Sequence, residues 1–172
     1  VALLAGEKID DLDEGNDSYS DYKSLYNGPK PEIKNFPEFN DELKYIHEYI
    51  ENIKRVDTES KICIVLRTQK LVDTYYDYFS SKDFQTLKIS RNSKDDLSNT
   101  NVRIATMHRV KGLDFDHVII ASMNKGIVPH ETGEISDEEL INKEYLQKEK
   151  SLVFVAATRA KKSLLVTSYG LK

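Results

Sequence analysis

Short, nearly continuous apolar runs, separated by amphipathic helical patterns, constrain the sequence from Pro31 onward more than any other feature. The clearest run is Lys61–Arg67, in which the five residues Ile62–Leu66 are all apolar. A run of this length and β-branched content is typical of a strand buried on both faces, and such strands occur in parallel sheets that helices cover on both sides. The pattern therefore predicts an α/β domain of three layers with a largely parallel sheet.

The same reasoning places the helices. Asn40 is a residue type that caps helix N-termini, and Asp41 and Glu42 would lie at the positive end of the helix dipole behind it. This helix is expected to bury Leu43, Ile46, Ile50 and Ile53, which fall at helical spacing. A Tyr-rich helix is expected over Leu71–Phe79. A capping box over Ser136–Glu139 is expected to open a long helix that carries Leu140, Ile141, Tyr145, Leu146, Leu152 and Val153 on one face.

Six strands are expected, and they alternate with helices as in a parallel sheet. They are placed at Glu32–Phe36, Lys61–Arg67, Thr86–Ser90, Val102–His108, His117–Met123 and Ser163–Tyr169.

Two regions are distinguished along the 172 residues. Residues 1–30 are acidic and rich in Gly, Ser and Asn, with little periodicity, and are interpreted as an irregular lead-in. Residues 31–172 have a length suited to one domain with a two-sided core. Because Val1–Ala5 resembles the end of a helix and no initiator Met is present, we expect the chain to be part of a longer protein.

The charge distribution is uneven. A formal net charge of −4 argues against a free-standing module that grips nucleic acid through a basic surface. Much of the acid lies near the N-terminus, whereas basic residues gather in the C-terminal half, so an anion site is to be sought there. The acidic residues are Glu7, Asp10, Asp11, Asp13, Glu14, Asp17 and Asp21, and the basic ones are Arg103, His108, Arg109, Lys111, Arg159, Lys161 and Lys162.

Several classes of protein are not expected. No apolar run approaches the roughly 20 residues that cross a bilayer, and the N-terminus has no signal-peptide pattern, so a cytoplasmic protein without membrane association is predicted. Cys63 lies in an apolar run and is expected to be a buried hydrophobe. The four histidines lack metal-ligand spacing. No Gly-x-x-x-x-Gly-Lys-Ser/Thr loop is present, so the chain alone is not expected to hydrolyse ATP efficiently.

The first segment whose side chains could bind a ligand is Thr106–Phe115, which follows the predicted strand ending near Ala105. It collects hydroxyl, imidazole, guanidinium and ammonium donors and turns at Gly112. Such donors suit phosphate oxygens, and ligands of open parallel sheets bind beyond the carboxyl ends of the strands. The alternative is a solvated loop in which Lys111 and Asp114 pair with one another.

The second segment is Phe154–Lys162 at the end of the long helix. Arg159 follows small or apolar residues, so the aliphatic part of its side chain is expected to be packed. This packing would hold the guanidinium group in a fixed direction. A guanidinium held in this way can stabilise charge on a departing phosphate. The alternative is an ordinary cation interacting with the helix C-terminus, which suits Lys161 and Lys162 better.

These segments resemble motifs of superfamily-1 helicases of the UvrD/Rep group. Thr106–Phe115 is similar to motif V of that family, T-[LM]-H-x-x-K-G-L-E-F. The resemblance spans about Pro31 to Gly170, and motifs V and VI in this order and spacing are highly specific. The other similar segments are Val155–Ala160 (motif VI), Ile62–Thr68 (motif IVa) and Gly126–Pro129.

The resemblance implies a RecA-like, P-loop NTPase-type fold and the place of the second, C-terminal motor domain. In this family ATP and Mg²⁺ lie between two motor domains, and single-stranded DNA crosses their top. Arg159 would be the arginine finger toward ATP bound mainly by the N-terminal motor domain. Gly112 and Asp114 would lie on the nucleotide side of motif V, with Lys111 between the nucleotide and the DNA.

The resemblance also implies DNA contacts. Thr106 and His108 would face the DNA backbone, whereas Arg67 would be either a DNA contact or a structural residue. The parent protein is accordingly expected to be an ATP-dependent DNA helicase, to which this chain supplies the arginine finger and part of the single-stranded DNA track.

The sequence departs from the family pattern at several points. Asp114 replaces the usual Glu and shortens the reach to the ribose, and Phe154 stands where a Tyr is common. The Asn-Tyr-Arg-Ser/Thr segment does not occur, which agrees with a truncated chain. Only residues 91–101 separate the predicted strands Thr86–Ser90 and Val102–His108, where relatives insert a helical accessory domain, so that insertion is not expected here.

Two other functions remain open at this point. A degenerate, non-catalytic motor-like module could bind DNA or a protein partner, although Arg159 and the Lys111-Gly112 turn count against it. An unrelated doubly wound phosphate-binding enzyme is the other alternative, and the sequence offers it no evident nucleophile and base.

Overall fold

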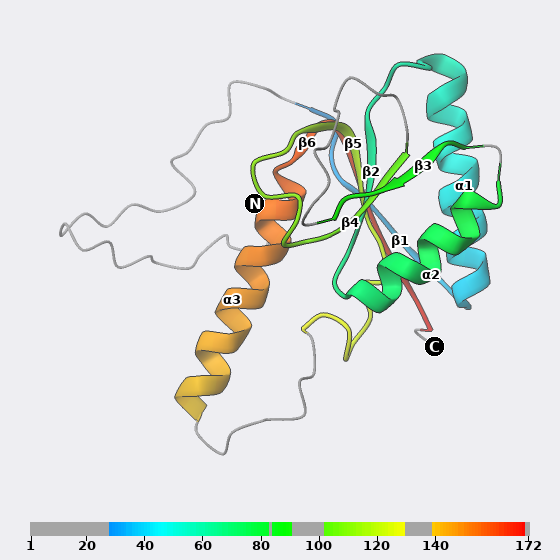
Figure 1. The fold of residues 1–172 in the computed structure, drawn as a ribbon. Helices are drawn as coiled ribbons and strands as arrows, with labels where there is room; N and C mark the ends of the chain where they lie inside the picture. Colours follow the sequence, from blue (N-terminus) through cyan, green and yellow to red (C-terminus); the bar gives the residue numbers. More distant parts are fainter. Residues whose placement is uncertain (1–27, 83, 91–101, 130–138, 171–172) are drawn as a thin grey trace.

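The chain forms a six-stranded sheet between two helical layers, as seen in a computed structural model that describes residues 28–82, 84–90, 102–129 and 139–170 (Figure 1). The elements in chain order are β1 (Glu32–Phe36), α1 (Phe39–Val56), β2 (Ile62–Leu66), α2 (Gln69–Ser80), β3 (Thr86–Lys88), β4 (Val102–Thr106), β5 (Phe115–Ile120), α3 (Glu139–Ala157) and β6 (Ala160–Tyr169).

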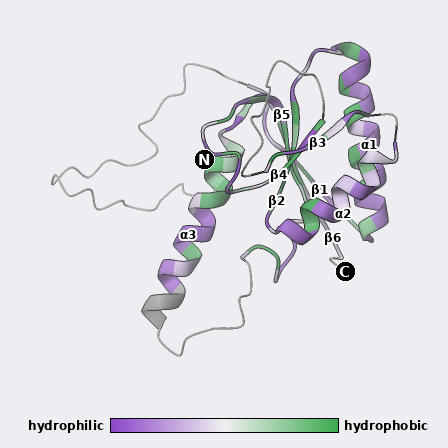
Figure 2. Cartoon of the chain, in the orientation of Figure 1, coloured by the Kyte–Doolittle hydropathy of each residue, from purple (hydrophilic) through white to green (hydrophobic). Residues whose placement is uncertain are grey.

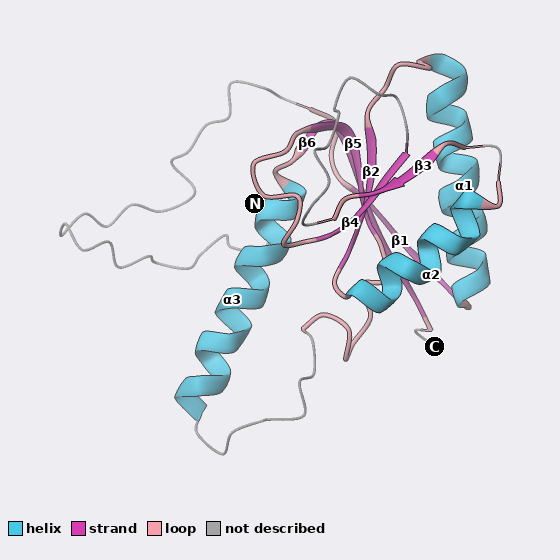
Figure 3. Ribbon diagram, in the orientation of Figure 1, coloured by secondary structure: helices cyan, strands magenta, loops and turns pink. Residues whose placement is uncertain are grey.

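The sheet order is β1-β6-β5-β2-β4-β3, and all five pairings among these strands are parallel (Figure 3). Strand β2 lies near the middle, with β4 on one side and β5 on the other, and all its residues are buried. The predicted α/β class and parallel sheet are therefore confirmed.

The alternation of side chains along β2 explains the three layers. Ile62, Ile64 and Leu66 join the core beneath α1 and α2, whereas Cys63 and Val65 join the core beneath α3. Neighbouring residues of a strand point to opposite faces, so a strand covered on both sides needs apolar residues at every position. Figure 2 shows apolar residues along the inner strands and a mixture of apolar and polar residues along the helices.

All six predicted strands exist, and β1 has the predicted bounds, whereas the other five differ by one to three residues at one or both ends; β2 is one residue shorter at each end. β3 ends at Lys88 and β4 at Thr106, both two residues early. β5 begins two residues early and ends at Ile120, because Ser122 adopts a left-handed backbone conformation with φ of 56°. β6 begins three residues earlier than predicted, at Ala160.

The predicted cap of α1 is wrong. The N-cap is Glu38, with no side-chain cap hydrogen bond, and Asn40 lies within the first turn. The backbone carbonyl of Glu38 accepts from the N–H groups of Asp41 (3.1 Å) and Glu42 (3.3 Å). Asp41 and Glu42 do lie in the first turn as predicted.

The predicted apolar face of α3 is correct only toward the C-terminus. Val153 is 7% exposed and Leu152 packs against the same core, but Leu146 is 45% exposed. Toward its N-terminus the helix extends beyond the sheet, so among the described elements its outer turns lie against no other layer (Figure 1). The capping box over Ser136–Glu139 and the side chains of Leu140 and Ile141 lie outside the described residues.

A buried carboxylate joins four parts of the fold. Glu42 of α1 is fully buried and accepts hydrogen bonds from Tyr75 of α2 (2.6 Å), from the backbone N–H of Ser122 (3.0 Å) and from the hydroxyl of Thr167 in β6 (2.5 Å). Burial, followed by the Glu42 charge, raises the pKa of Tyr75 well above its usual value. The N–H bond from Ser122 to Glu42 supports the left-handed conformation after β5.

His117 gives the fold a pH dependence. Its Nδ1 lies 2.7 Å from the Ser163 hydroxyl, whose oxygen is also 3.0 Å from the Tyr49 hydroxyl. Burial lowers the pKa of His117 below 6.5; Asp116 opposes this effect and Lys162 reinforces it. As the pH falls from the pKa of His117 in the unfolded chain toward its lower pKa in the folded chain, the unfolded chain binds more protons than the folded chain. The free energy of unfolding therefore falls as the pH falls.

We therefore expect the free energy of unfolding to decrease between pH 7.5 and pH 5.5, and to decrease less in His117→Gln than in the wild-type chain. Urea denaturation at both pH values measures the difference. His108→Gln, which alters an exposed loop side chain, should keep the wild-type difference. Equal pH dependence in all three proteins would remove His117 as its source.

Candidate functional site

A fully parallel sheet has an amino edge, where its strands begin, and a carboxyl edge, where they end. Phe115, the first residue of β5, pairs with Ala160, the first residue of β6. Asp114 and Arg159 directly precede these residues and so lie at the amino edge. The first candidate segment was expected beyond the carboxyl ends of the strands; this holds for Thr106 at the end of β4 and is wrong for Asp114 at the end of the segment.

The segment between β4 and β5 crosses from the carboxyl to the amino edge without a helix. Its course is fixed by two buried side chains, Met107 and Val110, which join the core beneath α3. The Met107 N–H donates to the Leu66 carbonyl (2.9 Å), and the Leu113 N–H donates to the Val110 carbonyl (3.1 Å). Gly112 has φ of 81°, a conformation that side chains disfavour.

These apolar anchors leave the polar side chains of the segment facing outward. His108, Arg109 and Lys111 are exposed, Gly112 is exposed, and Thr106 is half-buried. The segment therefore presents imidazole, guanidinium and ammonium donors to solvent.

Arg159 is held by three acceptors of its own domain. Its Nε donates to the Val155 carbonyl (3.1 Å), one NH group lies 3.2 Å from the Thr158 hydroxyl, and the other lies 3.4 Å from the Asp114 carboxylate. The side chain is 26% exposed. The guanidinium is thus held by hydrogen bonds, and the Nε contact satisfies a carbonyl at the C-terminus of α3, as the alternative interpretation proposed.

Asp114 is the point where the two predicted segments meet. Its carboxylate is 3.4 Å from Arg159 and 3.7 Å from Lys161, and a backbone bond from the Phe115 N–H to the Arg159 carbonyl (3.0 Å) fixes the approach. These are the ion pairs of Asp114 among the described residues, so the alternative pairing with Lys111 is not what the structure shows. A phosphate near Arg159 would compete with this carboxylate.

Arg67, which follows β2, forms a bidentate ion pair with Glu149 of α3. The Nε and NH2 groups donate to the two carboxylate oxygens at 2.8 and 2.6 Å, and the side chains are 13% and 7% exposed. The Glu149 hydrogen bond raises the pKa of Arg67, with a smaller contribution from Tyr145. Of the two roles left open for Arg67, these contacts favour the structural one.

Sequence reasoning did not find Glu149, although a signal was present. Glu149 precedes Val153 and Ala156 by four and seven residues, which is the spacing of one helix face. Both of those residues are buried against the sheet. An acidic residue on an apolar face requires a partner, and Arg67 is that partner.

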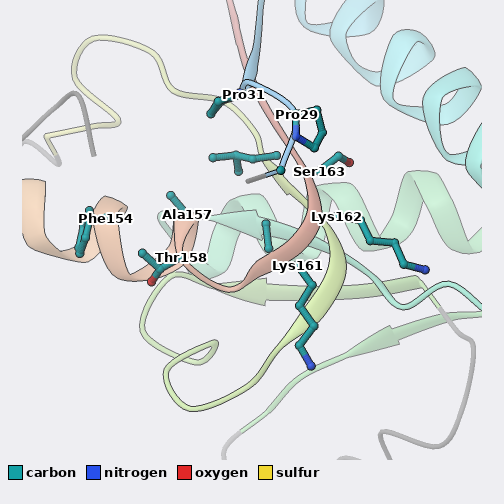
Figure 4. Close-up of a pocket in the computed structure, with 11 residues that line it drawn as sticks. Pro29, Pro31, Phe154, Ala157, Thr158, Lys161, Lys162 and Ser163 are labelled. Atoms are coloured by element: carbon teal, nitrogen blue, oxygen red, sulfur yellow. The ribbon is translucent and has the colours of Figure 1, made fainter. Parts of the chain in front are cut away.

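A pocket of about 720 Å³ lies beside the turn that carries Arg159 (Figure 4). Pro29 and Pro31 line it from one side, and residues at the end of α3 and the start of β6 line it from the other. Its cations are already paired, Lys162 with Asp57 (3.1 Å) and Asp116 (3.2 Å), and Lys161 with Asp114. The lining is completed by Gly28, Phe154, Ala157, Thr158, Ala160, Ser163 and Leu164.

The described residues contain no group of three or more His, Cys, Asp or Glu side chains that could hold a metal ion. The helices in the described ranges also lack the length and hydropathy that crossing a membrane requires. Cys63 is a fully buried free cysteine, as predicted.

Comparison with known proteins adds independent evidence. The family model described as the UvrD-like helicase C-terminal domain matches residues 83–170. The ATP-dependent DNA helicase Rep of Buchnera aphidicola (subsp. Schizaphis graminum) is 34% identical over 73 residues, which are 42% of this chain and 10% of that protein. DNA helicase II of Rickettsia typhi is 36% identical over 67 residues, 39% of this chain and 10% of that protein. The matched region is thus about a tenth of these relatives' length.

Among solved structures, the C-terminal domain of a possible DNA helicase from Lactobacillus plantarum WCFS1 has the same fold. The TM-score is 0.61 at 15% identity, over 83% of this chain and 76% of that one. The expected RecA-like architecture is therefore confirmed, and at this identity the likeness concerns the fold alone.

Proposed function

Because this chain belongs to the UvrD-like helicase C-terminal domain family, we propose that it is the second motor domain of an ATP-dependent DNA helicase. In this proposal the parent protein couples ATP hydrolysis to movement along single-stranded DNA, and a first motor domain of the same parent completes the ATP site. Opening and closing of the cleft between the domains would shift the grip on DNA in each cycle.

The nucleotide side of the proposal depends on the amino edge of the sheet. One observation carries it: Arg159 and Asp114, 45 positions apart, meet at this edge on a fixed backbone. Arg159 would stabilise charge on the γ-phosphate as the arginine finger. Gly112 and Lys111 lie on the segment that leads to this edge, where an exposed backbone and an ammonium group suit phosphate oxygens.

ATP with Mg²⁺ is the group that such a site would take. Arg159 at the amino edge and Lys111 on the segment that leads to it suit the phosphates, because both are cations. The residues at the amino edge do not supply carboxylates for Mg²⁺, since Asp114 is engaged with Arg159 and Lys161. In this proposal Mg²⁺ and most of the nucleotide are therefore held by the first motor domain, and Arg159 approaches from the opposite side.

The DNA side of the proposal uses the carboxyl edge and the crossing segment. Thr106 ends β4 at that edge and His108 is exposed just beyond it. A hydroxyl and an imidazole can hydrogen-bond phosphate oxygens without reading base sequence. Lys111, farther along the segment, stands between the two sides.

DNA-stimulated ATP hydrolysis by the full-length parent, measured beside this 172-residue chain, tests the proposed function. We expect turnover in the parent that single-stranded DNA increases, and none above background in the chain alone, because the chain offers only one side of the site. Inactivity of both proteins would instead favour a non-catalytic module that binds DNA or a protein partner.

A further inference from the structure

The attachment of α3 to the sheet is uneven along its length. Toward the C-terminus Val153 and Ala156 pack into the core, whereas residues 146–148 are exposed. Glu149 is 6% exposed and marks the point where the helix leaves the domain. Figure 1 shows the helix extending from there beyond the sheet. On this outer side, α3 is attached through the Arg67–Glu149 ion pair and through Tyr145, which hydrogen-bonds Arg67.

This ion pair is built to resist displacement. Both carboxylate oxygens accept from the guanidinium, at 2.6 and 2.8 Å, in a site where solvent hardly screens the charges. On the other side, Arg67 follows Leu66, whose carbonyl accepts from the Met107 N–H at 2.9 Å. The pair therefore ties α3 to the carboxyl ends of β2 and β4.

Arg159 stands ten residues beyond Glu149, at the end of the same helix, and its Nε is bonded to the helical carbonyl of Val155 (3.1 Å). The guanidinium consequently moves with the last turn of α3. A rotation of a helix by about 10° about its axis shifts a side-chain head by about 1 Å, given a helix radius of roughly 5–6 Å with side chains. A misplacement of about 1 Å can cost around 100-fold in rate.

We propose that Arg67 is a positioning residue for Arg159: the Arg67–Glu149 ion pair fixes the rotation and tilt of α3, and Arg67 does not contact DNA. The inference rests on the proposed function, because it concerns the finger of that same site. It assigns a role to Glu149 as well, as the carboxylate that holds Arg67.

The two roles of Arg67 predict opposite results for Glu149→Gln. If Arg67 contacted DNA, this substitution would release the guanidinium and leave ATP turnover intact. If Arg67 positions α3, then Arg67→Gln and Glu149→Gln should each lower the kcat of the full-length parent by roughly 10- to 100-fold. The double variant should lose no more than the larger single loss, because the two residues act as one unit.

Several readouts separate positioning from general damage. The KM for ATP and the affinity for single-stranded DNA without nucleotide should change less than about threefold, since neither depends on finger placement. In an Arg159→Ala background, Arg67→Gln should lower kcat no further. The reversed pair, Arg67→Glu with Glu149→Arg, should recover part of the activity. Lys148→Gln, at an exposed position on the same helix, is the matched control and should keep wild-type kcat.

The proposal would be overturned if Arg67→Gln lowered the affinity for single-stranded DNA while Glu149→Gln did not. It would also be overturned if Arg67→Gln lowered kcat in the Arg159→Ala background as much as it does in the wild-type parent. Amide hydrogen exchange on the 172-residue chain gives a readout independent of ATP turnover. Exchange in α3 should become faster in Glu149→Gln while exchange in α2 stays unchanged. If α3 exchanged at the same rate in Glu149→Gln and in the wild-type chain, the positioning role would be overturned. An inactive wild-type parent would count against the proposed function, and hydrogen exchange would still decide the role of the ion pair.

Discussion

Replacing Arg159 with alanine in the full-length parent is expected to lower DNA-stimulated ATP turnover by roughly 10³- to 10⁵-fold, the range that arginine fingers contribute to phosphoryl transfer. The reason is electrostatic: a planar, permanently charged group positioned in advance stabilises charge that develops only in the transition state. Steady-state turnover at saturating ATP and DNA measures the effect.

The fold should survive this substitution. Alanine at this position removes a hydrogen bond to a backbone carbonyl, one to the Thr158 hydroxyl and a 3.4 Å ion pair with the half-exposed Asp114. Exposed pairs of this kind contribute about 0–1 kcal/mol. Lys161→Ala is the matched control, because it removes a 61% exposed cation from the same carboxylate. Turnover near the wild-type value in Arg159→Ala would exclude Arg159 from the mechanism.

Replacing Glu42 with alanine should destabilise the chain by roughly 3–5 kcal/mol, because each buried donor left without an acceptor costs about 1–3 kcal/mol. The affected donors are the Ser122 N–H and the hydroxyls of Thr167, Tyr75 and Ser122. The two hydroxyls of Tyr75 and Ser122 keep a mutual bond of 2.8 Å, which limits the destabilisation. Urea denaturation at neutral pH measures the change.

Glu48→Ala is the control for this prediction. Glu48 is exposed on the same helix, so the same change in side chain should alter the free energy of unfolding by about 0.5 kcal/mol or less. The difference between the two variants isolates the buried network from helix propensity. Similar stability of both variants would show that Glu42 is not required to hold α1, α2 and β6 together.

The layers of this fold could be predicted because burial on two faces leaves a direct mark on the sequence. The apolar run Ile62–Leu66 has no polar position at which one face could meet water, and the structure buries every residue of it. The lone arginine after the apolar end of α3 was identified for a similar reason, since its neighbours leave its stem packed.

The features missed depend on contacts between distant residues. Asp114 meets Arg159 across 45 positions and Arg67 meets Glu149 across 82, and no local pattern encodes which cation pairs with which carboxylate. Glu42 resembled a favourable first-turn residue, yet its hydrogen-bond donors come from α2, β6 and the loop after β5.

The pairing of β1 with β6 also sets an order for folding. The Asn35 and Ser168 side chains bond across this pair although they are 133 residues apart in the chain, so β1 leaves the ribosome long before its neighbour in the sheet. Contacts of such separation form slowly because a long loop must first close. Until β6 is inserted, both β1 and β5 present unpaired edges, which are sites for aggregation. The sixth strand in chain order is therefore the one that makes the sheet continuous.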